Sequence, residues 1–121
     1  MISLFFALFA VAAAPPPPAK FGYLSAGDLD LRCRSSNPTD VSYCYAYVVA
    51  VHDTVRSYEK WLNVTEFCVP GVTPQAEIRA AFTGYMQAHP NSRDAEAASV
   101  VVVALKQHFA CAPDPAPTKK P

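Results

Sequence analysis

Apolar residues recur every three or four positions between Thr39 and Tyr58. Five of them share one side of a 3.6-residue period: Val41, Cys44, Val48, Val51 and Val55. This spacing predicts one long, mostly buried helix. Thr39, with Pro38 before it, is expected to cap the helix N-terminus through its hydroxyl. The rest of the chain is expected to form shorter helices and loops around this helix.

A short helix is expected upstream, from Ser25 to about Arg34. Ser25 is a suitable N-cap, Asp28 stands where a capping box places an acid, and Leu24 is placed to pack against Leu29. The run Ser35-Ser36-Asn37-Pro38 ends this helix.

A third helix is expected to begin with Thr73 as its N-cap and Pro74 in its first turn, where a missing N–H costs nothing. His89-Pro90-Asn91 ends it. Its expected inner face consists of Ile78, Phe82, Tyr85 and Met86.

The last helix is expected to begin at Asp94 as its cap, with Glu96 in its first turn and with Lys106 and His108 in its last turn, which suits the helix dipole. Its inward positions are expected to be Ala98, Val101, Val102, Leu105 and Phe109. The β-branched run Val100 to Val103 would also suit a strand, but the caps and the longer period favour a helix. An apolar stripe this wide predicts burial on more than one side, as in a dimer interface. The fold class is therefore all-α, a bundle of about four helices.

The two ends of the chain differ in composition from the segment between them. The run ISLFFALFAVAAA is too short to span a bilayer and is typical of a secretory signal, with a cleavage site at Ala10-Val11-Ala12. No basic residue precedes Lys20, so a misassigned start or a retained anchor is the alternative. We assign residues 1–20 to a signal peptide and Pro-rich spacer, 21–111 to one helical domain, and 112–121 to a disordered Pro-rich tail.

The four cysteines agree with export, because an even number in a small secreted domain indicates disulfides. No two of them form a C-x-x-C pair, which argues against zinc. Cys33 ends the first predicted helix and Cys44 lies one turn into the second. Antiparallel packing of the last two helices brings Cys68 to Cys111. Of the three possible pairings, we expect Cys33–Cys44 and Cys68–Cys111.

Charge and residue types exclude several function classes. Ten basic residues balance ten acidic ones, which argues against nucleic acid and against a polybasic membrane anchor. There is no Gly-rich phosphate loop and no nucleophile elbow, and each cysteine has a structural role. The sequence therefore predicts no enzyme, no cofactor, no metal site, no nucleic-acid partner and no membrane contact beyond the signal peptide.

His52 and Asp53 are neighbours on the long predicted helix, so their side chains are expected to point about 100° apart and not to form a dyad. Asp53 lies in an otherwise apolar stretch and is expected to be a structural polar residue. It would pair with Arg56 or accept hydrogen bonds from another helix or a second subunit. A role in partner binding is the alternative.

Two segments are expected to be exposed loops that contact a partner. The first, Tyr58 to Phe67, offers aromatic anchors among charged residues, although Trp61 and Phe67 would alternatively cap the core. The second runs from His89 to Asp94. The candidate contact residues are Tyr58, Glu59, Lys60, Trp61, Phe67, His89, Asn91 and Arg93.

The cysteines and their neighbours form a recognisable series. In order, it consists of Cys33, Cys44-Tyr45-Ala46-Tyr47 before a Val-rich helix with Asp53, Cys68-Val69-Pro70 before a helix led by Thr73, His89-Pro90, and Phe109-Ala110-Cys111. This series, covering roughly Phe21 to Cys111, resembles the Rap/Tai family of small exported immunity proteins.

The resemblance implies an all-helical, disulfide-stapled periplasmic protein that is usually a homodimer. It also implies a role in binding and inhibiting a cognate peptidoglycan amidase effector of type VI secretion, without catalysis of its own. A small periplasmic helical binding or chaperone-like protein of the cell envelope is the alternative.

Overall fold

The computed structural model describes residues 22–113, so the expected signal peptide, the spacer and residues 114–121 of the expected tail lie outside it. The described elements are α1 (Ala26–Arg34), α2 (Pro38–Leu62), α3 (Gln75–Ala88), η1 (Pro90–Ser92, a 3-10 helix) and α4 (Ala97–His108). Within these residues the only β-type pairing is an isolated antiparallel bridge between Ser25 and Glu96. The all-α prediction is confirmed. In the part of the chain that the structure describes, no helix combines the length and the apolarity needed to cross a membrane.

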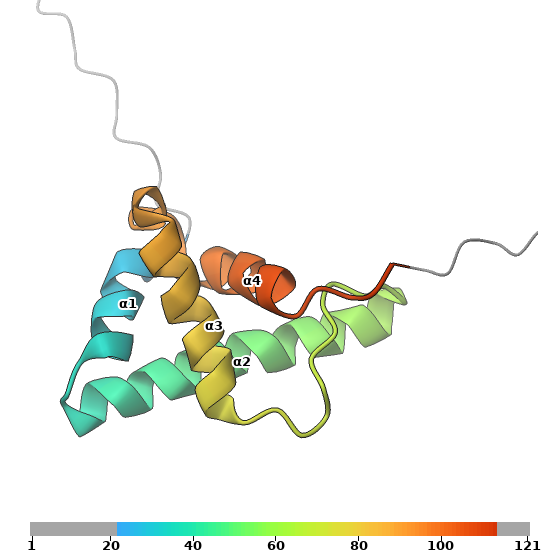
Figure 1. Cartoon of the computed structure of the whole chain (residues 1–121), viewed down its shortest axis with the longest axis horizontal. Coiled ribbons are helices and arrows are strands. Elements are labelled where there is room, and N and C mark those ends of the chain that lie inside the picture. Colours follow the sequence, from blue (N-terminus) through green and yellow to red (C-terminus); the bar gives the residue numbers. More distant parts are fainter. Residues whose placement is uncertain (1–21, 114–121) are drawn as a thin grey trace, which may run out of the picture.

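The long helix α2 runs along the molecule, and the other helices gather on it (Figure 1). Each of the four α-helices contacts the other three. α1 folds back beside the N-terminal half of α2, while the C-terminal end of α2 extends beyond α1 and α3 (Figure 1). This arrangement leaves much of α2 uncovered. Cys44, Val48 and Glu59 are its only buried residues, so the prediction of a mostly buried helix was wrong.

α2 begins earlier and ends later than the sequence pattern predicted. Asn37, not Thr39, is the N-cap, and its Oδ1 accepts a hydrogen bond from the Thr39 N–H at 2.8 Å. Pro38 is therefore the first helical residue, where no backbone donor is lost. At the other end, Asn63 adopts the left-handed conformation (φ 52°) and its N–H donates to the Glu59 carbonyl. The helix thus includes Tyr58 to Leu62, which had been assigned to its end and an exposed loop.

The cap of α1 was predicted correctly, and those of α3 and α4 were not. Ser25 Oγ accepts from the Asp28 N–H at 3.1 Å. Thr73 does not cap α3, which begins after Pro74 without a side-chain cap. α4 is capped by Glu96 rather than by Asp94, because the Glu96 carboxylate accepts from the Ala98 and Ser99 N–H groups at 2.9 and 2.8 Å.

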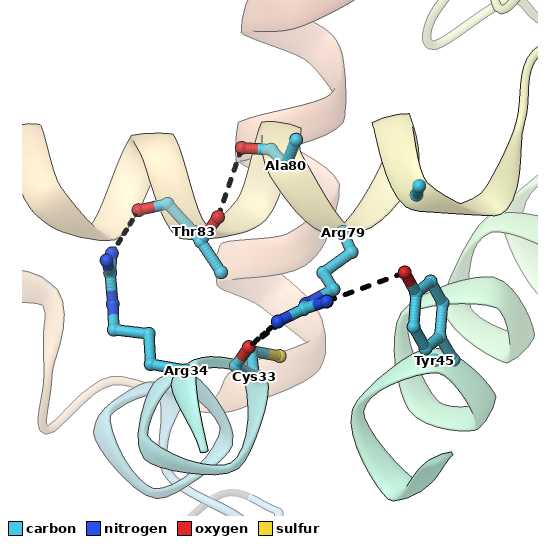
Figure 2. A pocket seen from close by; sticks show the side chains of 7 residues that line it. Cys33, Arg34, Tyr45, Arg79, Ala80 and Thr83 are labelled. Atoms are coloured by element: carbon cyan, nitrogen blue, oxygen red, sulfur yellow. Dashed lines mark hydrogen bonds between the residues drawn. The ribbon is translucent and has the colours of Figure 1, made fainter. Parts of the chain in front are cut away.

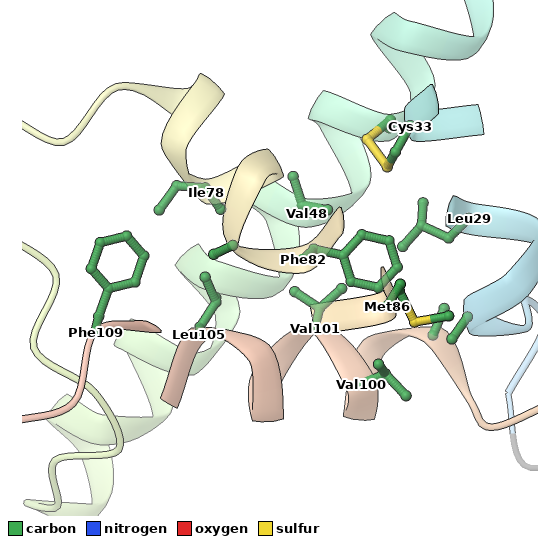
Figure 3. Close-up of a cluster of buried hydrophobic side chains, with 14 of the residues drawn as sticks. Leu29, Cys33, Val48, Ile78, Phe82, Met86, Val100, Val101, Leu105 and Phe109 are labelled. Atoms are coloured by element: carbon green, nitrogen blue, oxygen red, sulfur yellow. A yellow bond between two sulfur atoms is a disulfide. The ribbon is translucent and has the colours of Figure 1, made fainter. Parts of the chain in front are cut away.

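One apolar core lies where the four helices meet, around Phe82 (Figure 3). Its largest fully buried side chains are Phe67, Phe82, Leu29, Leu105, Val48 and Val101. The predicted inward face of α4 is correct in part: Val101, Leu105 and Phe109 are buried, whereas Ala98 and Val102 are only half-buried. Ala97, Val100 and Ala104 complete the buried face, and Val103 is exposed. Because α4 lies against three other helices, the wide apolar stripe is largely accounted for within one chain.

Both predicted disulfides are confirmed. Cys33–Cys44 joins α1 to α2 and is fully buried, with a Cα–Cα distance of 5.0 Å. Cys68–Cys111 joins the segment after α2 to the segment after α4, with a Cα–Cα distance of 4.9 Å, and both of its residues are exposed. Beside it, the Cys68 N–H donates to the Phe109 carbonyl at 2.8 Å.

Candidate functional site

The C-terminal end of α2 exposes a group of large apolar side chains. Tyr58, Trp61 and Leu62 are 53%, 72% and 66% exposed, and Val64 follows them in the next turn. Tyr58 and Trp61 lie three residues apart and pack edge to face, with ring centroids 5.3 Å apart. We call Tyr58, Trp61, Leu62 and Val64 the α2-end surface. Exposed aromatic side chains gathered in this way are typical of protein interaction sites.

The segment after α2 is held against the helix by one buried carboxylate. Glu59 Oε1 accepts hydrogen bonds from the Glu66 and Phe67 N–H groups at 2.6 and 3.3 Å. Its other oxygen, Oε2, lies 2.5 Å from Arg56 Nη1. Burial alone would raise the pKa of Glu59, but these backbone hydrogen bonds and the Arg56 guanidinium outweigh it, and the pKa is lowered.

These contacts decide which of the predicted contact residues face solvent. Phe67 is fully buried and packs in the core, so the alternative reading of Phe67 was the correct one. Glu59 is buried as well and holds the loop instead of facing a partner. Trp61 does not cap the core, and Lys60 beside it is exposed.

Two further contacts hold the segment that follows α2. Lys106 Nζ lies 2.5 Å from Glu66 Oε2, and the Cys68–Cys111 disulfide follows directly. The α2-end surface therefore lies between fixed points: Glu59 within the helix, and Glu66 and Cys68 in the segment after it. A surface that is already ordered loses less conformational entropy when it binds.

The second predicted contact segment, His89 to Asp94, lies far from the first, near the start of α1 (Figure 1). His89 is half-buried and stacks on Tyr85 with ring centroids 4.0 Å apart. Arg93 donates to Asp30 Oδ2 at 3.3 Å and to the Gly27 carbonyl at 3.2 Å, which ties it to α1. Asn91 is exposed. The structure thus does not bring the two segments into one site.

Asp30 is a buried carboxylate that the sequence reading missed. Arg34 Nε lies 2.8 Å from its Oδ1, and Arg93 approaches its Oδ2 from the segment before α4. The four-residue spacing of Asp30 and Arg34 on one helix was a signal for the first contact. Nothing local in the sequence points to the second, because Arg93 lies 63 residues away.

His52 and Asp53 contact each other despite being neighbours on the helix, so the prediction that they could not pair was wrong. His52 Nδ1 lies 2.9 Å from Asp53 Oδ1 because the Asp53 side chain, 71% exposed, is free to bend over the helix surface. Arg56 pairs with Glu59 rather than with Asp53. The Asp53 side chain is exposed and, within the described residues, bonds only to His52, so the predicted contact with Arg56 or with another helix is not made.

His52 and Asp53 line a groove of about 350 Å³ between α2 and the start of α3. No serine or cysteine lines this groove, and Thr73, its one hydroxyl residue, makes no hydrogen bond with His52 among the described residues. The groove thus places no serine or cysteine side chain beside the pair. In residues 22–113, no three side chains of His, Cys, Asp or Glu are grouped as metal ligands.

A second groove, of about 440 Å³, lies between α1, α2 and α3 (Figure 2). Arg79 projects into it and donates to the Cys33 carbonyl at the end of α1. The sequence reading did not single out Arg79, because its surroundings come from three separate helices.

No curated protein matches this sequence. The family model of the Rap1a immunity proteins matches residues 25–111. The matched segment begins at the cap of α1 and ends at Cys111, so it includes all four α-helices and both disulfides. The chain therefore belongs to the Rap1a immunity protein family.

Proposed function

We propose that this protein is a periplasmic immunity protein that binds a peptidoglycan amidase effector of type VI secretion and inhibits it without catalysis of its own. The family match across the whole helical domain is the observation that carries this proposal. Two disulfides agree with an exported protein.

We assign effector binding to the α2-end surface. Trp61 and Tyr58 present large apolar areas on side chains with few rotatable bonds, which is why such residues dominate binding energies. Lys60, next to Trp61 in the sequence, is exposed, and we assign it to the charged rim of this surface. The end of α2 also extends beyond α1 and α3, so these two helices leave it uncovered (Figure 1).

The test starts from the genome: an amidase gene beside this one would supply the candidate effector, which is purified and titrated with the immunity protein. We expect one effector molecule to bind per immunity-protein subunit. Peptidoglycan hydrolysis should be lost when the two are present in equal amounts. Trp61→Ala should weaken the complex by about 100-fold, the size of a central aromatic anchor. Tyr43→Ala removes an exposed tyrosine at the opposite end of α2 and should leave binding unchanged.

Two outcomes would contradict this assignment. The first is equal inhibition by wild type and Trp61→Ala, which would move the contact elsewhere. The second is the absence of any complex together with protection of many unrelated unfolded proteins at low pH. That result would favour the chaperone-like alternative.

The proposal includes association of two copies, as the family resemblance implies. Val103 is the one exposed valine in the run of four on α4 and offers a point to test it. Sedimentation of the purified protein should give a dimer, and Val103→Glu should shift it to monomer if α4 forms the interface. A wild-type monomer would remove this part of the proposal.

A further inference from the structure

The groove between α1, α2 and α3 is lined almost entirely by hydrogen-bond donors and small side chains. Arg34 and Arg79 form its walls together with Tyr45, and Ala76 and Ala80 form part of its lining (Figure 2). No carboxylate lines it. We call it the Arg79 groove.

Arg79 differs from the other four arginines, all of which lie within the described residues. Each of the others pairs with a carboxylate: Arg32 with Asp40, Arg34 with Asp30, Arg56 with Glu59 and Arg93 with Asp30. Within residues 22–113, no carboxylate lies within ion-pair distance of Arg79. The half-buried Arg79 guanidinium thus carries a charge that no described acid neutralises.

The bonds that Arg79 makes leave part of its donor capacity free. Its Nε and Nη2 donate to the Cys33 carbonyl, and its Nη1 lies 3.5 Å from the Tyr45 hydroxyl. A guanidinium has five N–H donors, so two remain. The Tyr45 hydroxyl accepts in this contact and has no acceptor of its own among residues 22–113, so its O–H remains available as well.

Arg79 Nη1 and the Tyr45 hydroxyl lie 3.5 Å apart, and both residues line the groove. A carboxylate is the group that suits this arrangement, because its two oxygens accept from two adjacent donors and its charge offsets that of the guanidinium. The methyl side chains of Ala76 and Ala80 leave room for a protein segment to come close.

We propose that the Arg79 groove binds an aspartate or glutamate side chain of the effector. This inference rests on the proposed function, since it names a chemical feature of the same partner. Along α2, Tyr45 and Trp61 are about 24 Å apart and roughly 160° around the helix from each other. The groove is therefore a second contact, separate from the α2-end surface.

The groove can be tested without the effector. Blocked alanine peptides containing a single glutamate or a single glutamine are titrated into the labelled protein and followed by NMR. The glutamate peptide should shift the Arg79 Nε–H resonance and the Ala80 and Thr83 amide resonances, saturating at millimolar concentration. The glutamine peptide should not. Equal shifts with both peptides, or no shift with either, would overturn carboxylate binding.

The effector supplies the second test. Tyr45→Phe removes only the hydroxyl, so the fold is retained and a loss of about tenfold in affinity is expected. Arg79→Gln should lose more, and the affinity that remains should depend less on salt. Arg32→Gln makes the same charge change outside the groove and should leave affinity unchanged.

The outcomes separate this inference from the proposed function. If wild type binds the effector and Tyr45→Phe and Arg79→Gln bind it equally well, the groove assignment fails and the proposed function stands. If no complex forms, the proposed function fails, and the peptide titration still reports on the groove. If Arg79→Gln abolishes self-association and leaves effector affinity intact, the carboxylate comes from a second copy, and the assignment to the effector is wrong.

Discussion

The backbone N–H of Phe67 donates to the side-chain carboxylate of Glu59 at 3.3 Å. The contact holds the segment after α2 against the helix at the point where the Phe67 ring enters the core. Trp61, two residues after Glu59 on the same helix, faces solvent.

Removal of this carboxylate should loosen the end of α2. Glu59→Ala leaves the buried Phe67 N–H and the neighbouring Glu66 N–H without their acceptor, and we expect a loss of about 2 kcal/mol in the free energy of unfolding. Urea denaturation followed by circular dichroism measures it. Lys60→Ala, the exposed neighbour, should change stability by less than about 0.5 kcal/mol. Equal stability of Glu59→Ala and wild type would show that the hydrogen bonds do not hold the loop.

Stability should fall in acid. The pKa values of Glu59 and Glu96 are lowered in the folded protein from an ordinary value of 4.5, in both cases because hydrogen bonds to the carboxylate outweigh the opposing effect of burial. At pH below 4.5 the unfolded chain therefore binds more protons than the folded one, so stability decreases as pH falls through the folded-state pKa values.

Thermal unfolding between pH 7 and pH 3 checks this dependence. Glu59→Gln removes one of these two carboxylates, so the melting temperature should depend less steeply on pH below 4.5 than that of wild type. An unchanged slope would mean that Glu59 titrates at the same pH in the folded and unfolded protein.

The two disulfides should be reduced in a fixed order. Cys68 and Cys111 are exposed, whereas Cys33 and Cys44 are fully buried, and a thiolate must reach a sulfur atom to attack it. Limited treatment with a dithiol, followed by alkylation and peptide mapping, should label Cys68 and Cys111 first. Labelling of Cys33 and Cys44 should require denaturant. Simultaneous labelling of all four would indicate reduction through global unfolding.

Loss of the carboxylate of Asp30 should destabilise the joint between α1 and the segment before α4. Asp30→Ala leaves Arg34 and Arg93 without their shared acceptor, and we expect a loss of about 2 kcal/mol, moderated because both guanidinium groups also reach solvent. Asp94→Ala removes an exposed acid nearby as a control. Chemical denaturation of both variants measures the difference, and equal values would assign no structural role to Asp30.

Several local features were predictable from sequence because their causes are local. The Ser25 cap and the Asp28 that follows it lie three residues apart, and helix-breaking residues between Arg34 and Pro38 were evident. The disulfide pairing was predictable for a related reason: helices joined by short connections bring Cys33 to Cys44 and Cys68 to Cys111.

Errors arose where two residues competed for one role. Asn37 and Thr39 are both good N-caps, and Pro38 between them favours Asn37 because a proline suits the first helical position. On α4, a run of four valines fits more than one inward face. The contacts with three other helices selected Val100 and Val101 and left Val103 exposed.

The sequence alone determined the helical class, the approximate elements and the oxidised cysteine pairs, since these follow from periodicity, caps and short connections. Only the tertiary structure decided that Phe67 is buried and Trp61 exposed, that Asp30 joins Arg34 to Arg93, and that Arg79 lies beside Tyr45 without a carboxylate. These relationships depend on side chains from different helices meeting in space. Burial and charge neutralisation depend on contacts between residues far apart in the sequence, so local sequence patterns do not predict them.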